Sequence, residues 1–272
     1  MSEELVTVEV IDGVADVRLN RVDKYNALSQ DMFKAIISAG QELTDRKDVR
    51  AVVLSGNGRG FCAGLDMGSF AGMADRASSS SSSDVDNLLE RGNSPENFAQ
   101  RPAYVWKQMP VPVIAALHGV AFGGGAQIAL GADIRIAAPD VQMSVMEIKW
   151  GLIPDMSLTQ TLRDIVPLDV AKELTFTGRI LDGNEAMQLG LVTKISETPL
   201  EDALQMAREI ADKSPDAIRA GKTLWEQAWH ADERTGLELE AALQTQLIGQ
   251  PNQVEAIKAN FEKRAPNFND PQ

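Results

Sequence analysis

The sequence predicts an α/β protein in which helical crossovers join parallel strands, followed by a helical C-terminal region. Short apolar segments alternate with helical segments through residues 1–196, a pattern that is typical of parallel crossover units. From residue 197 to residue 272, apolar side chains recur at helical spacing instead. A chain of 272 residues is long enough to bury one large core and to carry such a region beside it.

The N-terminal segments predict a hairpin followed by a helix. Apolar residues alternate with polar ones at 6–11 and 14–19, and Asp12-Gly13 between them is a hairpin turn signal. Residues 30–43 have the apolar spacing of an amphipathic helix, and Ser29 is placed to cap its N-terminus.

The middle of the chain predicts further strands and a helix. Residues 50–55 form an apolar strand segment that ends in a glycine-containing turn. Residues 113–117 and 133–138 are also expected to be strands, with a helix at 124–130 between them. Because this order is strand, helix, strand, the two strands are expected to be parallel.

Residues 67–100 interrupt the alternation. They contain six consecutive serines, Ser78 to Ser83. Such a run has too little apolar surface to offset the entropy lost when it is ordered. We expect residues 67–100 to form a mobile surface loop over or beside a site; an inert insertion is the alternative.

The C-terminal region, residues 197–272, is expected to be helical. Apolar periodicity runs through residues 203–210, 217–225, 237–247 and 254–261. Such a region buries little core of its own, so we expect it to pack on a partner subunit.

The composition argues against several classes of function. A formal net charge of −13 disfavours a nucleic-acid partner, because such binding requires a basic face. With two histidines and a single cysteine, Cys62, the chain offers neither a typical zinc site nor an intrachain disulfide. No apolar run reaches about 20 residues and the acidic start lacks a signal segment, so we expect a cytoplasmic protein with no membrane contact.

A glycine pattern at residues 58–63 resembles a dinucleotide-binding turn, but its surroundings do not fit one. Residues 58–63 follow a strand and fit the G-x-G-x-x-A form of a dinucleotide-binding turn. About 20 residues later such a fold needs a second strand with an acid for the ribose, and here the chain enters the serine run. The context therefore disfavours dinucleotide binding.

Two other glycine turns, at residues 60–66 and 120–125, are more informative. Each lies between an apolar strand and the start of an expected helix. Glycine lets the backbone approach a ligand closely, and the free N–H groups at a helix start favour negative charge. Two such amides on one oxygen would form an oxyanion hole, which stabilises an enolate or a tetrahedral intermediate. Tight backbone packing is the alternative explanation for these glycines.

Two carboxyl groups, Glu147 and Asp155, lie in an apolar stretch at residues 143–156. Burial would raise their pKa values toward neutrality, which suits a group that transfers protons at pH 7. In the alternative interpretation, Lys149 neutralises one of them at the surface, or Asp155 caps a helix that starts at Met156.

Four motifs in this order resemble the crotonase (enoyl-CoA hydratase/isomerase) superfamily. They are residues 20–28, the turn at 60–66, the segment 112–125 and the ending at 261–266. The resemblance implies a crotonase-like (ClpP/crotonase) α/β fold, a spiral of ββα units with a C-terminal helical region. It also implies an acyl-CoA thioester substrate, no cofactor apart from the coenzyme A of that substrate, no metal, and a homotrimer or dimer of trimers.

The resemblance also implies roles for single residues. The amides of Leu65 and Gly124 would be the donors of the oxyanion hole. Lys263 would contact coenzyme A, as residues of this kind do in the superfamily, sometimes from a neighbouring subunit. The residues expected to line the coenzyme A and substrate path are Arg21, Lys24, Tyr25, Ala27, Ala63, Gly64, Asp66, Met67, Phe122, Gly123 and Lys263.

A departure from the hydratase pattern bears on the reaction. Hydratases of this superfamily use two glutamates, but Gln127 occupies the position of one of them, and glutamine cannot take up a proton. Asp155 follows Glu147 by eight residues, as in dienoyl-CoA isomerases. We therefore expect a double-bond isomerase with Glu147 and Asp155 as catalytic groups and Gln127 as a positioning residue. The alternatives are a hydratase that uses Asp155, another enolate reaction, and a catalytically silent coenzyme A-binding protein.

Overall fold

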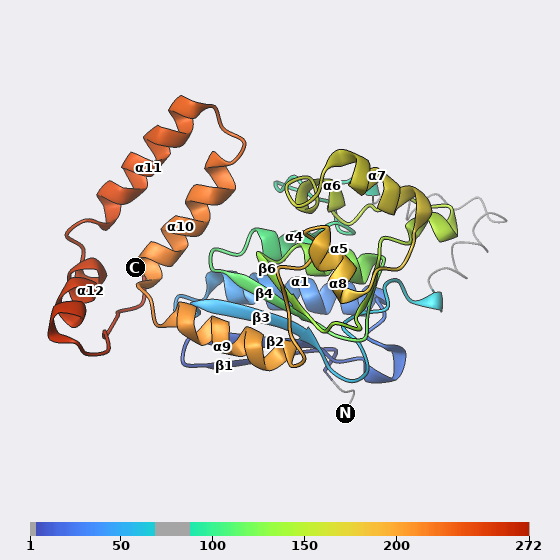
Figure 1. Cartoon of the computed structure of the whole chain (residues 1–272), viewed down its shortest axis with the longest axis horizontal. Coiled ribbons are helices and arrows are strands. Elements are labelled where there is room, and N and C mark those ends of the chain that lie inside the picture. Colours follow the sequence, from blue (N-terminus) through green and yellow to red (C-terminus); the bar gives the residue numbers. More distant parts are fainter. Residues whose placement is uncertain (1–3, 69–87, 272) are drawn as a thin grey trace.

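The computed structural model describes residues 4–68 and 88–271 (Figure 1). Residues 69–87, and with them the serine run predicted to be a mobile loop, lie outside the described residues. The main sheet has six strands in the order β1-β2-β3-β4-β6-β8. These strands are β1 (Val6–Ile11), β2 (Val14–Leu19), β3 (Ala51–Gly56), β4 (Val113–Leu117), β6 (Ile134–Ala137) and β8 (Lys194–Ile195).

The sheet is parallel except at its N-terminal edge, where β1 and β2 form the predicted hairpin. Asp12 and Gly13 in its turn have φ values of 50° and 80°, the left-handed backbone that two-residue hairpin turns require. The predicted strands at 50–55 and 133–138 form within one residue of their expected ends, as β3 and β6.

Helices cover both faces of this sheet. One face packs against α1 (Gln30–Asp45), which the side chain of Ser29 caps by accepting a hydrogen bond from the Met32 N–H at 3.2 Å. The other face packs against α9 (Pro199–Ala211), which presents alanines at every fourth position. Successive residues of β3 point to opposite faces, so that Val52 lies with α1 and Val53 with α9.

A second layer holds two short strands, β5 (Val120–Phe122) and β7 (Gln142–Ser144), which pair in parallel. The helix α5 (Gly124–Leu130) follows β5 directly and is buried along its whole length. The other short helical elements are η1 (Val22–Lys24), α4 (Arg101–Lys107), η2 (Glu147–Trp150), α6 (Leu158–Thr161), α7 (Leu168–Thr177) and α8 (Gly183–Gln188).

The last three helices extend away from the sheet, as Figure 1 shows. They are α10 (Pro215–Ala228), α11 (Glu233–Leu247) and α12 (Pro251–Glu262). No residue of α11 is buried, and Trp225 of α10 and Phe261 of α12 are 64% and 84% exposed. Of the predicted helical region, then, α9 packs on the sheet and the other helices present apolar side chains to solvent. None of the helices in the described ranges is long and apolar enough to span a membrane.

Candidate active site

The two glycine turns lie against each other. The Cys62 N–H donates to the Val120 carbonyl oxygen at 2.9 Å, and the Phe122 N–H donates to the Cys62 carbonyl oxygen at 3.0 Å. A Cβ on Gly64, whose φ is +83°, would stand 2.5 Å from the Phe122 carbonyl oxygen and 3.6 Å from the Gly124 nitrogen. Glycine is therefore needed for this approach, and the approach brings the first turn to the start of α5.

The backbone N–H groups of Leu65 and Gly124 lie at this junction. The residues on either side of Leu65 are held by Leu28, whose N–H donates to Gly64 and whose carbonyl oxygen accepts from Asp66, so the Leu65 N–H faces away from that pairing. Gly124 is the first residue of α5, where an N–H has no acceptor within the helix. Within residues 4–68 and 88–271, neither N–H has a protein acceptor. Two free donors beside a helix start are suited to an oxyanion.

Glu147, at the start of η2, is held by Gln127 of α5. The Gln127 Nε2 atom donates to Glu147 Oε1 at 2.6 Å. The other carboxyl oxygen, Oε2, is buried and has no hydrogen-bond partner in the described part of the chain. Burial raises the pKa of the Glu147 carboxyl, and the negative charge of Asp155 acts in the same direction. A buried carboxyl oxygen without a partner calls for an explanation, since most buried polar atoms are hydrogen-bonded, and contact with a substrate would supply one.

Glycine also clears the space around this carboxyl group. Gly123 has a φ of +51°, and a Cβ there would stand 3.2 Å from Glu147 Oε1. At Gly124 a Cβ would meet Met156 Sδ at 2.7 Å and Leu28 Cδ1 at 2.8 Å. The start of α5 is therefore enclosed by the carboxyl group and two apolar side chains, which strengthens electrostatic interactions by lowering the local dielectric.

Asp155 lies at the edge of the site. The residue keeps contact with solvent, yet the surrounding protein raises the pKa of its carboxyl group through partial loss of hydration. The alternative capping role does not hold, because α6 begins at Leu158 with Ser157 at its N-cap. Neither does the alternative pairing with Lys149: its ammonium lies 5.5 Å from the Trp150 ring, and no described lysine forms an ion pair with Glu147 or Asp155.

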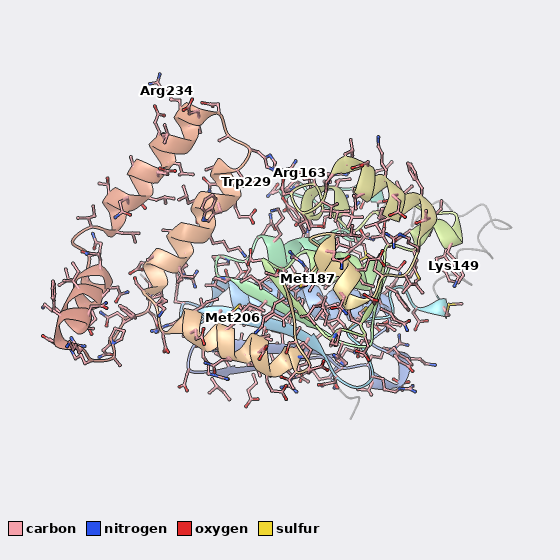
Figure 2. All side chains as sticks on the ribbon, viewed as in Figure 1. Lys149, Arg163, Met187, Met206, Trp229 and Arg234 are labelled. Atoms are coloured by element: carbon pink, nitrogen blue, oxygen red, sulfur yellow. The ribbon has the colours of Figure 1, made fainter. Side chains whose placement is uncertain are left out.

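Figure 2 shows Lys149 at the surface, on the side of the molecule away from the C-terminal helices. Nowhere in residues 4–68 and 88–271 do three or more histidine, cysteine, aspartate or glutamate side chains gather as metal ligands would.

Residues of the N-terminal motif frame the first turn. The Arg21 guanidinium donates to the Ala27 carbonyl oxygen at 3.0 Å and forms an ion pair with Asp66 at 2.5 Å. The pKa of Asp66 is lowered by a hydrogen bond from the Gly68 N–H and by Arg21. These two predicted substrate-binding residues are therefore engaged with each other and fix the chain after Leu65.

The structure gathers most of the remaining predicted residues around the two turns. Lys24 and Met67 are exposed, and Tyr25, Ala63 and Phe122 are half-buried. The Arg59 guanidinium lies 4.2 Å from the centre of the Tyr25 ring.

Lys263 is the exception among the predicted site residues. It follows α12, which Figure 1 places far from α5 within one chain. One chain therefore does not bring Lys263 to the site.

Asn26 also holds this region together, although the sequence did not point to it as a site residue. It is fully buried with a φ of 57°, and its side-chain Nδ2 donates to the carbonyl oxygens of Asn57, Gly60 and Phe61 at 3.0 to 3.1 Å. Its Oδ1 accepts from the Arg21 N–H at 2.8 Å. The signal in the sequence was its place inside the N-terminal motif, but its partners are distant in the chain.

Comparisons with known proteins show which family this chain belongs to. The sequence profile described as enoyl-CoA hydratase/isomerase matches residues 9–271. The chain is 35% identical over 263 residues to mitochondrial methylglutaconyl-CoA hydratase of Mus musculus, covering 94% of this chain and 79% of that protein. It is 31% identical over 280 residues to peroxisomal Delta(3,5)-Delta(2,4)-dienoyl-CoA isomerase of Arabidopsis thaliana, covering 98% of each.

Solved structures give the same result for the fold. An enoyl-CoA hydratase from Bacillus anthracis matches with a TM-score of 0.85 at 29% identity, covering 97% of this chain and 98% of that one. An enoyl-CoA hydratase from Mycobacterium smegmatis matches with a TM-score of 0.83 at 28% identity, covering 97% and 99%. The predicted fold and resemblance are thus confirmed, and the chain belongs to the enoyl-CoA hydratase/isomerase (crotonase) family.

Proposed function

We propose that this enzyme moves a double bond within an enoyl-CoA or dienoyl-CoA thioester. The observation that carries the proposal is the pair formed by Gln127 and Glu147, in which the group beside the carboxyl is an amide. An amide holds its partner but does not exchange protons near neutral pH. The site therefore offers one enclosed proton carrier, Glu147, with Asp155 as a second carboxyl nearer to solvent.

The reaction would proceed through an enolate. The thioester oxygen would accept hydrogen bonds from the Leu65 and Gly124 amides, and each such donor contributes about 3 kcal/mol to lowering the barrier. Glu147 would remove a proton from C2 of a 3-enoyl chain, and the electron pair would pass to the thioester oxygen. Return of that proton at C4 would restore the carbonyl and leave the double bond at C2, with no change in mass. A placed acid/base of this kind contributes about 10²- to 10⁴-fold.

With a 3,5-dienoyl chain the two carboxyl groups would act at opposite ends of the diene. Glu147 would remove the proton near the thioester, and Asp155 would supply one at the far end. The raised pKa of Asp155 supports this, because a carboxyl that keeps its proton to higher pH is better able to donate it.

Coenzyme A, as part of the substrate, would follow the path lined by Lys24, Tyr25, Ala63 and Met67, and no separate cofactor takes part in the proposal. We propose further that the chain assembles as a homotrimer or dimer of trimers. The exposed apolar side chains of α10 and α12 support this, because large exposed apolar surfaces mark contacts with other proteins. In such an assembly Lys263 would reach the site of a neighbouring subunit.

Hydration of a 2-enoyl-CoA is the second candidate. The similarity to methylglutaconyl-CoA hydratase of Mus musculus favours it. In that case Asp155 would act with Glu147 on a water molecule. A silent coenzyme A-binding protein is disfavoured by Oε2 of Glu147, which is buried and has no partner among the described residues; binding alone does not require such an arrangement.

The test is incubation with a 3-enoyl-CoA, a 3,5-dienoyl-CoA and a 2-enoyl-CoA, with products resolved by chromatography and mass. We expect the double bond to move without a change in mass, and Glu147→Gln to abolish this. Asp155→Asn should impair the diene reaction more than the monoene reaction. Glu197→Gln, at an exposed position, is the matched control and should leave the rates unchanged. A gain of one water on the 2-enoyl substrate alone would refute the isomerase proposal.

A further inference from the structure

We infer that Gln127 is a positioning residue that sets which oxygen of Glu147 exchanges the proton, reserving Oε2 for the substrate. The inference rests on the proposed function in one respect: it takes Glu147 as the proton carrier. The two oxygens of the Glu147 carboxyl group have different roles, and the side-chain amide of Gln127 causes the difference.

The orientation of the Gln127 amide is fixed by the backbone. The Met156 N–H donates to Gln127 Oε1 at 2.9 Å, and an N–H group can only donate. The atom facing Met156 must therefore be the amide oxygen, which turns the NH₂ group toward Glu147. Gln127 is completely buried, so no solvent competes for either bond.

A fixed NH₂ group makes the two Glu147 oxygens unequal. Oε1 accepts a hydrogen bond from Gln127 at 2.6 Å. If the carboxyl takes up its proton on Oε1, that oxygen becomes a hydroxyl, which is a poorer acceptor, and the buried NH₂ loses its partner at a cost. The proton is therefore directed to Oε2, the oxygen that has no partner within the described ranges.

The same amide also places the second carboxyl group. Met156 follows Asp155 directly, is 5% exposed, and is tied to α5 through Gln127. Gly124, whose N–H belongs to the proposed oxyanion hole, starts that same helix. Gln127 thus fixes the positions of Glu147 and of the backbone beside Asp155 relative to α5, the helix whose first N–H would bind the thioester oxygen.

A neighbouring charge acts on Glu147. The negative charge of Asp155 raises the pKa of the Glu147 carboxyl group. The helix α5 carries no charged residue. The other charged residues of η2, and those of α7, which packs against η2, are Lys149, Asp169, Lys172 and Glu173.

The experiment replaces Gln127 with a side chain of similar length that forms no hydrogen bond. In Gln127→Met, titration of the protonated carboxyl band of Glu147 by infrared spectroscopy should move to higher pH, because a donor to the carboxylate is lost. The band is identified by its absence in Glu147→Gln. The acidic limb of kcat/KM should move in the same direction, with kcat down about 10- to 100-fold and KM changed less than about threefold.

Two further variants keep the result interpretable. Gln160→Met makes the same change on the exposed surface of α6 and should alter neither the titration nor kcat. Gln127→Glu keeps an acceptor for the Met156 N–H but sets a second carboxyl against Glu147. That pair should retain one proton to higher pH than wild type, so this variant tests the contact even if Gln127→Met does not fold.

Different results would contradict the positioning role of Gln127 and the isomerase reaction. An unchanged Glu147 titration and pH profile in folded Gln127→Met and Gln127→Glu would overturn the positioning role. The infrared titration needs no substrate, so it holds whatever reaction the enzyme performs. Absence of double-bond movement in the wild-type enzyme would instead refute the isomerase proposal and leave the titration result standing.

Discussion

Replacing Gly64 with alanine should separate the two turns that form the proposed oxyanion hole. The new Cβ would stand 2.5 Å from the Phe122 carbonyl oxygen, so the turns must part by about 0.9 Å to restore an ordinary contact of 3.4 Å. Alanine at a φ of +83° adds about 1–2 kcal/mol of backbone strain. With the steric term, we expect a loss of about 2–4 kcal/mol in the free energy of unfolding.

The effect on catalysis should exceed what this destabilisation explains. A shift of about 1 Å in a catalytic donor costs about 10²-fold in rate, and the Leu65 amide lies directly after the substituted residue. Steady-state kinetics at 25 °C, where the variant stays folded, should show kcat reduced about 100-fold and KM changed little. Thermal unfolding reports the stability loss in parallel.

Gly92→Ala is the matched control, because a Cβ there meets no atom of the described residues within 4 Å and its backbone is not in the left-handed region. It should change the free energy of unfolding by less than about 0.5 kcal/mol and leave kcat unchanged. If Gly64→Ala keeps kcat within about threefold of wild type, the 60–66 turn does not supply a donor and the reasoning is wrong.

Three other predictions concern the carboxyl groups, Asn26 and the C-terminal helices. Glu147→Gln and Asp155→Asn should each raise Tm at pH 8 by roughly a few degrees and by less at pH 4, measured by calorimetry. Folding raises the pKa of each carboxyl group, so the group does not affect the free energy of unfolding below its unfolded-state pKa and lowers that free energy as pH rises through its folded-state pKa. Equal changes in Tm at both pH values would contradict this. Asn26→Ala should cost about 2–4 kcal/mol in denaturant unfolding, because buried carbonyl groups lose their donor, and a loss below about 0.5 kcal/mol would rule out that role. If the chain assembles as proposed, Phe261→Lys should lower its sedimentation coefficient, and an unchanged value would show that Phe261 does not hold subunits together.

Much of the fold could be predicted because its signals are local. The hairpin at Asp12-Gly13, the Ser29 cap and the buried strand β3 each depend on a few adjacent residues. The pairing order of the strands could be predicted only as parallel crossovers, since which strands become neighbours depends on packing far along the chain. Apolar periodicity likewise could not predict which helix packs on the sheet, since α9 and α11 both show it, yet α9 packs there and α11 stays exposed.

The site was predicted in its groups but not in its contacts. Glu147 stood out as a carboxyl in an apolar stretch, whereas Gln127 could be read from the sequence only by comparison with a family position. Its two hydrogen bonds join residues 20 and 29 positions away, and no sequence pattern encodes such pairs. The same holds for Asn26, whose acceptors lie more than 30 positions along the chain.

The sequence left two explanations for the glycine turns, tight backbone packing and anion binding, and the structure makes the first a condition of the second. Only residues without a Cβ let the Phe122 carbonyl approach Gly64 and the Cys62 carbonyl approach Gly125, where a Cβ would stand 2.4 Å from that oxygen. These contacts use the carbonyl groups of one turn against the backbone of the other. The Leu65 and Gly124 N–H groups have no acceptor in the part of the chain that the structure describes. A larger side chain at either glycine would therefore affect both packing and the electrostatic site, because the same backbone atoms serve both.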